Sequence, residues 1–370
     1  MTDRNKPLLI IATSPIYAED GYKARVEMEV GILHEYFNIT LLLPERDDKE
    51  LVFAADVNKL FYRPYYGNKL RLFLAGAEIR KRVSEFCNDN KEAIIYGEAL
   101  LGSYFAVTAK TYGSSVIFDC HGAEPYEQKM QGDGLKNRVL SVLFKSFERS
   151  TVKRADCIVT VTDALYSLLK TKKKYVKLPM LPSDFFLAER NKRSEIRQKL
   201  GIPADSTVFV YSGGNAVWQM CRETVELYKR IETDSTFLMV LTNAEDYFKE
   251  LIRKTGIKHY KVMKAAYEEV PAFLDAADFG FCIRSDNTVN NVASPTKILE
   301  YLSRNVKPVI TGCIGDFSSE LGNRNLACIL DNSLSNTDTI VKQQGFNGIQ
   351  FVKEQRAKYI SGYVKMLSNM

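Results

Sequence analysis

Several patterns that would indicate a particular site or compartment are missing from this sequence of 370 residues. The seven cysteines form no CxxC pair, which argues against a zinc site or a disulfide scaffold and fits a reducing compartment. No apolar run approaches the roughly 20 residues that cross a membrane, and the short run at 8–12 lacks the order of a signal peptide. The GxGxxG fingerprint of dinucleotide-binding folds is also absent. We therefore expect a cytoplasmic protein without a transmembrane helix.

The composition is that of a globular protein, with 45% hydrophobic and 26% charged residues, and the length suffices for two domains. The net charge of +6 is unevenly spread, because the segment from Lys129 to Lys177 holds twelve Lys/Arg and four Asp/Glu. This segment is either a solvated basic surface or a contact for an anionic membrane, where each basic side chain contributes about 1 kcal/mol. Nucleic acid is not expected as a partner, because the segment contains no recognisable binding module.

Apolar runs alternate with amphipathic segments along the whole chain, which predicts doubly wound parallel sheets. The opening unit has a strand at 8–12, a loop that ends at Gly21, a helix at 22–37 and a strand at 39–43. Further strands are expected at 93–96, 115–119, 157–161, 208–211, 237–241, 260–263 and 309–311. We predict a first domain at 1–183, a linker at 184–204, a second domain at 205–347 and a C-terminal helix at 348–370.

The stretch 290–312 is the strongest candidate for a ligand site. Ser294 suits a helix N-cap and Pro295 the first helical position. Lys297 would lie in the first turn, where a cation opposes the helix dipole, and Glu300 would follow on the same surface. Two interpretations are open: a solvated Lys/Glu pair, or a phosphate on the helix N-terminus that Lys297 neutralises while Glu300 accepts hydrogen bonds from sugar hydroxyls.

Two further positions at predicted strand ends could meet an anion. The pair Gly213-Gly214, with Asn215 behind it, follows an apolar strand directly, and glycines permit close approach of backbone to phosphate. Arg284 ends another strand and needs an anionic partner. The candidates for that partner are a bound phosphate, an acid on a second substrate, and Asp286.

A third candidate position lies in the first half of the chain. His121, one of only three histidines, stands at a strand end two residues after Asp119, whose carboxylate could orient the ring. A structural histidine is the alternative. Glu124 and Glu127 follow in the same loop and would either contact substrate hydroxyls or start a helix.

Three segments carry a resemblance to a known family. SPTKILEYLSRNVKPVI resembles the SPxKxxEYLAxGxPVI segment of retaining glycosyltransferases of the large family four, which have the GT-B fold. FDCHGAEPYE resembles the D-x-H/R-G…E segment of the SPxK subgroup, and ADCIVTVTDALYSLL resembles the family's ADxIIxVSxxL. Two positions depart from the common pattern: Val292 replaces a second glutamate, and Asn305 replaces a glycine.

The resemblance implies two Rossmann-like domains that face a cleft, with a C-terminal helix that crosses back to the first domain. It implies catalytic roles for His121, Asp119 and Lys297. On the acceptor side it implies Gly21 and Arg25, for which a surface arginine is the alternative, together with Glu124 and Glu127. The donor-binding residues that it implies are Gly213, Gly214, Asn215, Met263, Arg284, Ser294, Pro295, Thr296, Lys297 and Glu300.

The function that follows from the resemblance is transfer of a sugar from a UDP- or GDP-linked donor to a glycan or lipid-linked acceptor in surface-polysaccharide synthesis. No DxD triplet is present, so we expect no metal and no cofactor. The resemblance implies retention of anomeric configuration. Helix N-termini and Lys297 would stabilise the leaving diphosphate instead. The alternatives are a nucleotide-sugar epimerase, disfavoured by few histidines and no clear carboxylate cluster, and a catalytically silent binding subunit.

Overall fold

The computed structural model describes residues 6–13, 21–45, 57–63, 69–111, 113–132, 134–189, 191–341 and 345–370. These residues separate into two compact units. The first unit comprises residues 1–179 and 358–370, and the second unit comprises residues 180–357. The predicted loop between the first strand and Gly21 falls mostly on residues 14–20, which lie outside the described residues.

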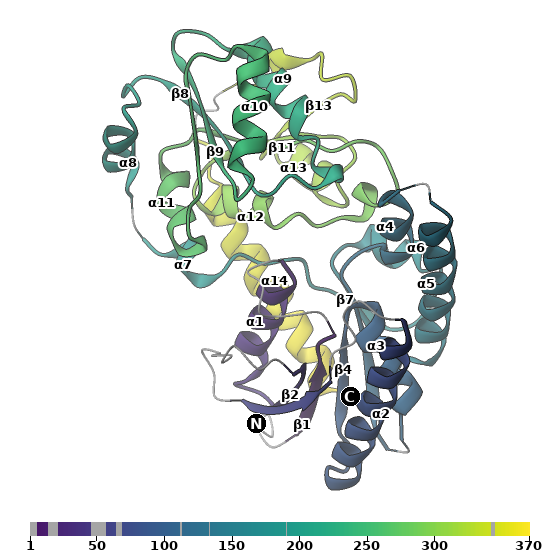
Figure 1. Ribbon diagram of the computed structural model, residues 1–370. Helices are drawn as coiled ribbons and strands as arrows, with labels where there is room; N and C mark the ends of the chain where they lie inside the picture. The colour runs from purple at the N-terminus through teal and green to yellow at the C-terminus, as the bar shows by residue number, and fades with distance from the viewer. Residues whose placement is uncertain are drawn as a thin grey trace. The chain divides into compact units, whose positions relative to one another are not determined.

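The first unit is built on a seven-stranded sheet of order β3-β2-β1-β4-β5-β6-β7, whose neighbouring strands run parallel (Figure 1). Its strands are β1 (Pro7–Ile11), β2 (Asn38–Pro44), β3 (Asn58–Tyr62), β4 (Ile94–Glu98), β5 (Ser115–Cys120), β6 (Cys157–Thr160) and β7 (Tyr175–Lys177). Its helices are α1 (Gly21–Leu33), α2 (Lys69–Asp89), α3 (Ala99–Ala109), α4 (Glu124–Met130), α5 (Leu135–Arg154) and α6 (Asp163–Leu168). The central strands are apolar and buried along almost their whole length, as in parallel sheets covered on both faces.

The second unit repeats this plan with a six-stranded parallel sheet of order β10-β9-β8-β11-β12-β13 (Figure 1). Its strands are β8 (Thr207–Ser212), β9 (Thr236–Leu241), β10 (Tyr260–Met263), β11 (Phe279–Cys282), β12 (Lys307–Thr311) and β13 (Cys328–Leu330). Its helices are α7 (Asp184–Leu187), α8 (Arg193–Leu200), α9 (Cys221–Ile231), α10 (Glu245–Thr255), α11 (Val270–Asp275), α12 (Thr296–Ser303) and α13 (Phe317–Asn323). The predicted linker 184–204 contains α7 and α8.

The last helix, α14 (Gly348–Ser368), belongs to both units, since the division between them falls after Ala357. This agrees with the expectation of a C-terminal helix that returns to the first domain. Among the described residues, no helix is long and apolar enough to cross a membrane.

In each sheet the strand order reverses at one place, and the candidate site residues follow strands at or next to that reversal. In the first unit β1 pairs with both β2 and β4, and in the second β8 pairs with both β9 and β11. Open parallel sheets leave a crevice beyond the carboxyl ends of the two strands at such a reversal, which is where they bind ligands. The residues after β4 and β1, and those after β8 and β11, are therefore the ones to inspect.

Candidate functional site

The glycines after β8 allow a close approach between the strand end and α12. Gly213 has a φ of 137°, a conformation that side chains rarely tolerate. A Cβ atom at this position would lie 2.9 Å from Nζ of Lys297, so a larger residue would displace that ammonium group. Asn215, which follows the glycine pair, is exposed. The predicted pair of features, a glycine turn and Lys297, is thus brought together in the second unit.

The prediction for the start of α12 was wrong by one residue. Pro295, not Ser294, is the N-cap, because Pro295 has an extended ψ of 120° and the helix begins at Thr296. No side chain caps this helix, and the buried Oγ of Ser294 has no hydrogen-bond partner among the described residues. The N-terminus of α12 therefore keeps the uncapped N–H groups that suit an anion.

Two cations lie beside this helix terminus. Nζ of Lys297 donates to Oε1 of Gln219 at 3.2 Å and lies 4.2 Å from the ring centroid of Tyr211. Burial lowers the pKa of Lys297 to about 8. Nη1 of Arg284, a residue only 6% exposed, donates to the carbonyl of Trp218 at 2.7 Å, while its buried Nε has no hydrogen-bond partner in the part of the chain that the structure describes.

Neither cation has a carboxylate partner within the described part of the chain. The candidate partner Asp286 instead accepts a hydrogen bond from Asn291 at 2.8 Å. Leaving a buried donor unsatisfied costs on the order of 1–3 kcal/mol, more when it is charged. The unpaired Nε of Arg284 and the hydroxyl of Ser294 therefore point to an anion that these groups would bind.

Glu300 is the acidic group of this region. It is buried, and the hydroxyl of Tyr267 donates to its Oε1 at 2.8 Å. Burial raises the pKa of Glu300 to about 7. Met263 ends β10, and its carbonyl oxygen accepts the N–H of Thr242 at 2.9 Å. The solvated Lys/Glu pair weighed from spacing is therefore absent, because Glu300 binds a tyrosine and Lys297 a glutamine.

Arg25 on α1 is the centre of a buried network in the first unit. Its side chain is completely buried, so it is not a surface arginine. It forms two hydrogen bonds with Asp119, at 3.2 and 3.0 Å, and an ion pair with Glu29 at 2.8 Å. Burial alone would raise the pKa of Asp119, but the charges of Arg25 and His121 outweigh it and hold that pKa well below its usual range.

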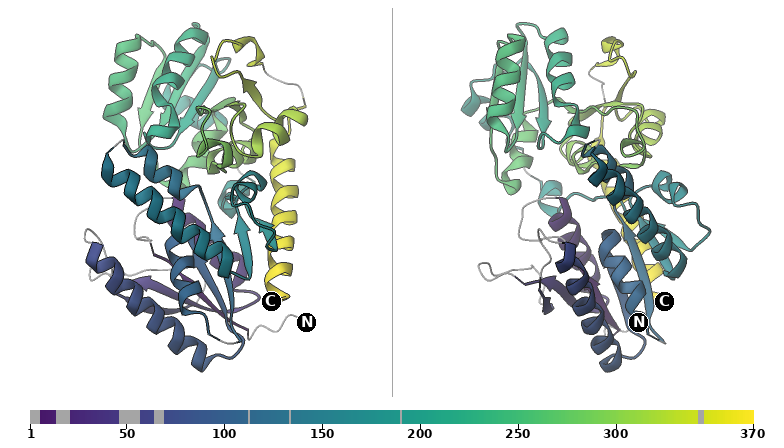
Figure 2. Two further views of the ribbon diagram at one scale, coloured as in Figure 1. Left: turned by 90° about the vertical axis from the view of Figure 1, so that its right-hand side faces the viewer. Right: turned by 45° about the vertical axis from the view of Figure 1, so that its right-hand side comes forward.

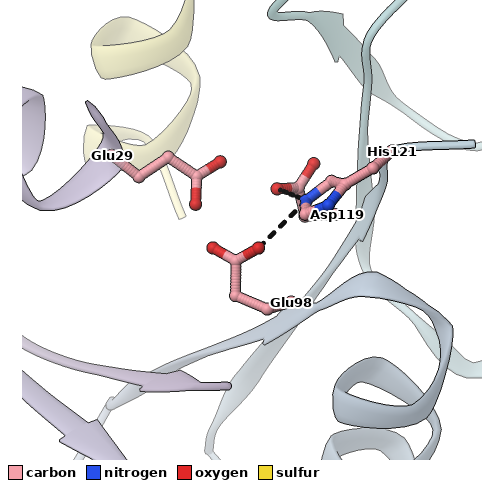
Figure 3. Close-up of side chains that lie close together, drawn as sticks. All are labelled: Glu29, Glu98, Asp119 and His121. Atoms are coloured by element: carbon pink, nitrogen blue, oxygen red, sulfur yellow. Dashed lines mark hydrogen bonds and ion pairs between the residues drawn. The ribbon is translucent and has the colours of Figure 1, made fainter. Parts of the chain in front are cut away.

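His121 connects this network to the surface. Its Nε2 lies 2.6 Å from Oδ2 of Asp119 and 2.9 Å from Oε2 of Glu98, and its side chain is 20% exposed. Figure 3 shows Glu29, Glu98 and Asp119 converging on one another and on the ring. The predicted pairing of Asp119 with His121 is present. The expectation that the chain has no carboxylate cluster was wrong, because three distant carboxylates meet here.

The same cluster is the set of described side chains best arranged to hold a metal ion. One ligand atom from each of Glu29, Glu98, Asp119 and His121 lies within 4.8 Å of the others. The guanidinium of Arg25 already contacts two of these carboxylates. A metal bound here would replace the hydrogen on Nε2 of His121 and would compete with Arg25 for Glu29 and Asp119.

The remaining acceptor-side candidates are Glu124 and Glu127, on the helix α4 that follows His121, and Gly21 on α1. Glu124 accepts the N–H of Leu100 at 2.7 Å and so caps α3, and burial raises the pKa of Glu124 to about 7. A Cβ atom at Gly122 would lie only 2.4 Å from Oε1 of Glu127, so the glycine leaves room for this carboxylate. Burial raises the pKa of Glu127. Gly21 is the first residue of α1.

Sequence reasoning missed Glu29 and Glu98. Glu98 is the last residue of β4, directly opposite Asp119 in register. Glu29 lies one turn after Arg25 on the buried side of α1, and its Oε1 accepts the hydroxyl of Tyr96 at 2.8 Å. An acid at the carboxyl end of an apolar run, as in IIYGE, was the available signal.

Comparisons with known proteins bear on the fold. No protein-family model and no curated protein matches the chain. Sucrose-phosphate synthase from Thermosynechococcus elongatus is similar with a TM-score of 0.69 at 10% identity, covering 98% of this chain and 94% of that one. WaaG, a glycosyltransferase involved in lipopolysaccharide biosynthesis, is similar with a TM-score of 0.64 at 13% identity, covering 98% of this chain and 92% of that one. HepE of Anabaena in complex with UDP and glucose is similar with a TM-score of 0.65 at 12% identity, covering 99% of this chain and 100% of that one.

These three structures are glycosyltransferases of one architecture, and each is covered over nearly its whole length. At this level of identity the likeness establishes fold and not activity. It agrees with the two parallel sheets and with the division of α14 between the units. The chain therefore has the GT-B fold of two Rossmann-like units joined again by a C-terminal helix.

Proposed function

We propose that this protein is a glycosyltransferase that takes its sugar from a nucleotide-sugar donor. One observation carries the proposal: at the strand reversal of the second unit, Arg284 and Lys297 have no carboxylate partner among the described residues, and both lie beside the uncapped start of α12. A diphosphate would satisfy these groups and would lie against the glycine turn after β8. A nucleotide sugar as the ligand is supported by the similar structure of HepE, which was solved with UDP and glucose.

The roles of the donor-site residues follow from their chemistry. Lys297, Arg284 and the N–H groups of α12 would neutralise the charge that develops on the departing diphosphate, and charge stabilisation of this kind needs no metal. Glu300, held by Tyr267, would accept hydrogen bonds from the ribose hydroxyls. Ser294, Pro295 and Thr296 would shape the phosphate end of the pocket, and Met263 the base end. Retention of configuration, and uridine or guanosine as the base, are part of this proposal.

The first unit would contribute His121 to the transfer step. Its ring is partly exposed, whereas the carboxylates behind it are fully buried. Only the histidine of this cluster could therefore touch the transferred sugar or the acceptor hydroxyl. Glu124 and Glu127 would lie beside the acceptor, which we propose to be a glycan or a lipid-linked sugar of a surface polysaccharide.

A lipid-linked acceptor would require contact with a membrane, and α5 is suited to one. This helix packs on α3 and α4 at the surface of the first unit (Figure 2). It exposes Leu135 (78%) and Val142 (72%), with Val139 and Leu143 beside them. It carries six Lys/Arg and a single acid, Glu148. Apolar side chains among basic ones favour contact with an anionic lipid surface over a merely solvated basic surface.

The first test is a thermal-shift panel of nucleoside diphosphates and nucleotide sugars. We expect one nucleotide series to raise the melting temperature, and the effective base would identify the donor. Lys297→Ala should abolish the shift, whereas Lys249→Ala, which changes an exposed lysine on α10, should keep it. If no nucleotide shifts the wild type, the proposal of a donor site is wrong and the silent-subunit alternative gains support.

The carboxylate cluster keeps the epimerase as a second candidate, since epimerases need acid and base groups. Product analysis with the identified donor separates the two activities. Release of the nucleoside diphosphate, by transfer or slow hydrolysis, supports a glycosyltransferase. A nucleotide sugar recovered with an altered sugar supports an epimerase.

A further inference from the structure

A single turn of 3₁₀ helix, Val217–Gln219, lies beside both cations of the second unit. The carbonyl of Trp218 accepts from Nη1 of Arg284 at 2.7 Å, and the side-chain oxygen Oε1 of Gln219 accepts from Nζ of Lys297 at 3.2 Å. These two contacts are the only hydrogen bonds that the described residues provide to the charged ends of the two side chains. Two adjacent residues of one turn therefore receive both cations.

The ammonium group of Lys297 lies between Gln219 and the ring of Tyr211. The atom of Gln219 that faces it must be the amide oxygen, because an ammonium group can only donate hydrogen bonds. The hydroxyl of Tyr211 is within hydrogen-bond distance of the same oxygen and of the carbonyl of Gly214, so its hydrogen can be given to either. The ring centroid of this buried tyrosine lies 4.2 Å from Nζ of Lys297, a favourable distance for a cation above an aromatic face.

The backbone before and after the turn makes room for the contact between Lys297 and Gln219. A Cβ atom at Gly213 would lie 2.9 Å from Nζ of Lys297 and 3.2 Å from Oε1 of Gln219, so a larger residue would separate the two groups. Met220 has a φ of 46°, a left-handed conformation that is uncommon for a residue with a side chain, and α9 begins at the next residue. The turn is thus bounded by two unusual backbone positions, of which the glycine preserves this contact.

Both oxygens that receive the cations are neutral. A carboxylate at position 219 would form an ion pair with Lys297 and would compete with an anionic ligand, whereas an apolar side chain would remove the acceptor of a partly buried ammonium group. An amide oxygen accepts a hydrogen bond without cancelling the charge. The other hydrogens of this ammonium group have no acceptor among the described residues, so they are available to a ligand.

We infer that Gln219 is a positioning residue for Lys297, whose ammonium group it fixes with a neutral oxygen so that the charge remains available to an anionic ligand. The proposed function does not use Gln219, and the inference goes beyond it by assigning this residue a role. That the anion is the diphosphate of a nucleotide sugar rests on the proposed function, whereas the contact between Gln219 and Lys297 does not.

The surroundings of Lys297 make its charge sensitive to the residue at position 219. Burial lowers the pKa of Lys297 to about 8. The titratable and charged groups that face it are Tyr211 on β8, Cys221 on α9, Cys282 on β11, Arg284 after β11 and Glu300 on α12 itself. A hydrogen bond to the charged form of a group, or an opposite charge beside it, favours that form. Removing the acceptor at position 219 should therefore lower the pKa of Lys297, and a carboxylate there should raise it.

Nuclear magnetic resonance of the lysine side chains tests this contact without any nucleotide. In the full chain labelled with ¹³C-lysine, the signal that is lost in Lys297→Ala belongs to Lys297, and we expect it to titrate near pH 8. Gln219→Met, which keeps the length of the side chain but not the acceptor, should lower this pKa, and Gln219→Glu should raise it. Gln198→Glu, which changes an exposed glutamine on α8, should match the wild type. An unchanged titration in both Gln219 variants would overturn the inference.

Affinity for an anion provides the functional readout, measured by calorimetry with inorganic pyrophosphate and with the nucleoside diphosphate that the thermal-shift panel selects. Gln219→Glu should weaken binding about 100-fold or more, because the added carboxylate pairs with Lys297 and repels the ligand. Gln219→Met should weaken it only about 3- to 10-fold, the effect of one hydrogen bond. The melting temperature of Gln219→Glu should equal or exceed that of the wild type, because an ion pair is added. Equal losses of affinity in the two variants would mark a structural residue and overturn the inference.

The positioning role and the proposed function fail in different ways. If neither pyrophosphate nor any nucleotide binds the wild type, while the pKa of Lys297 moves in both directions as expected, the donor site is wrong and the role of Gln219 stands. If a nucleoside diphosphate binds the wild type and both Gln219 variants equally well, the donor site stands and the role of Gln219 is wrong.

Discussion

The two units have the same topology but opposite chemistry at the strand reversal. In the first unit Arg25 is paired with Glu29 and Asp119, and His121 lies at ion-pair distance from Asp119 and Glu98. In the second unit Arg284 and Lys297 meet no carboxylate among the described residues, and buried donors remain unsatisfied. Oppositely charged groups that pair with one another hold a side chain in place, whereas cations without such a partner are available to an anionic ligand. The difference supports the proposal that the second unit binds the nucleotide and that the first unit presents His121.

The largest effect on activity should come from removing the ammonium group of Lys297. Lys297→Ala should lower kcat/KM about 100-fold or more, since it deletes a charge aimed at the leaving group. The melting temperature should stay the same or rise, because a partly desolvated ammonium is lost. Steady-state kinetics and calorimetry with the nucleoside diphosphate measure both effects. Near-normal turnover would remove Lys297 from the site and weaken the contrast between the units.

A smaller effect should appear in the pH dependence of nucleotide binding. Glu300, with a pKa of about 7, must be ionised to accept from the ribose, so affinity should fall as pH drops below 7. Lys297, with a pKa of about 8, must be charged, so affinity should also fall as pH rises above 8. Calorimetry across this range should give a maximum between the two values. Glu300→Gln should flatten the acidic limb alone, and an unchanged profile would exclude Glu300 from the ribose site.

The smallest effect on catalysis should come from α5. Leu135→Ser combined with Val142→Ser should leave nucleotide affinity unchanged, because both side chains are exposed and belong to the first unit. The double variant should bind anionic vesicles more weakly than the wild type in co-sedimentation. Equal binding of wild type and variant, or equal binding to neutral vesicles, would count against a lipid contact on this helix.

Much of the fold could be predicted because its strands are continuous apolar runs. Strand β10 was predicted with its observed ends, and the strands β5, β6 and β9 within one residue of theirs. Strand β3, with the sequence NKLFY, was missed because it is largely exposed and alternates weakly. The helix α1 ends at Leu33 and not at residue 37, since the chain turns to enter β2.

The candidate site was only partly predictable, because spacing does not reveal burial. Lys297 and the glycine turn could be anticipated from a helix start and a strand end. Arg25 could not be placed correctly, since its partners Glu29, Asp119 and the carbonyl of Leu178 come from three segments. Tyr301, a position shared with the resembling family, is structural: its hydroxyl accepts the N–H of Ser212 at 3.0 Å.

The helix α14 has a consequence for synthesis on the ribosome. Residues 1–179 emerge first, yet the core of their unit includes Tyr363, Met366 and Leu367, which are made nearly two hundred residues later. Tyr363 packs edge-on against Tyr96, which lies two residues before Glu98 on β4. The nascent first unit therefore exposes part of its apolar interior, and its carboxylate cluster lacks one wall, until the whole second unit has been translated. Chaperone contact during that interval would be expected to centre on the apolar surface that α14 later covers.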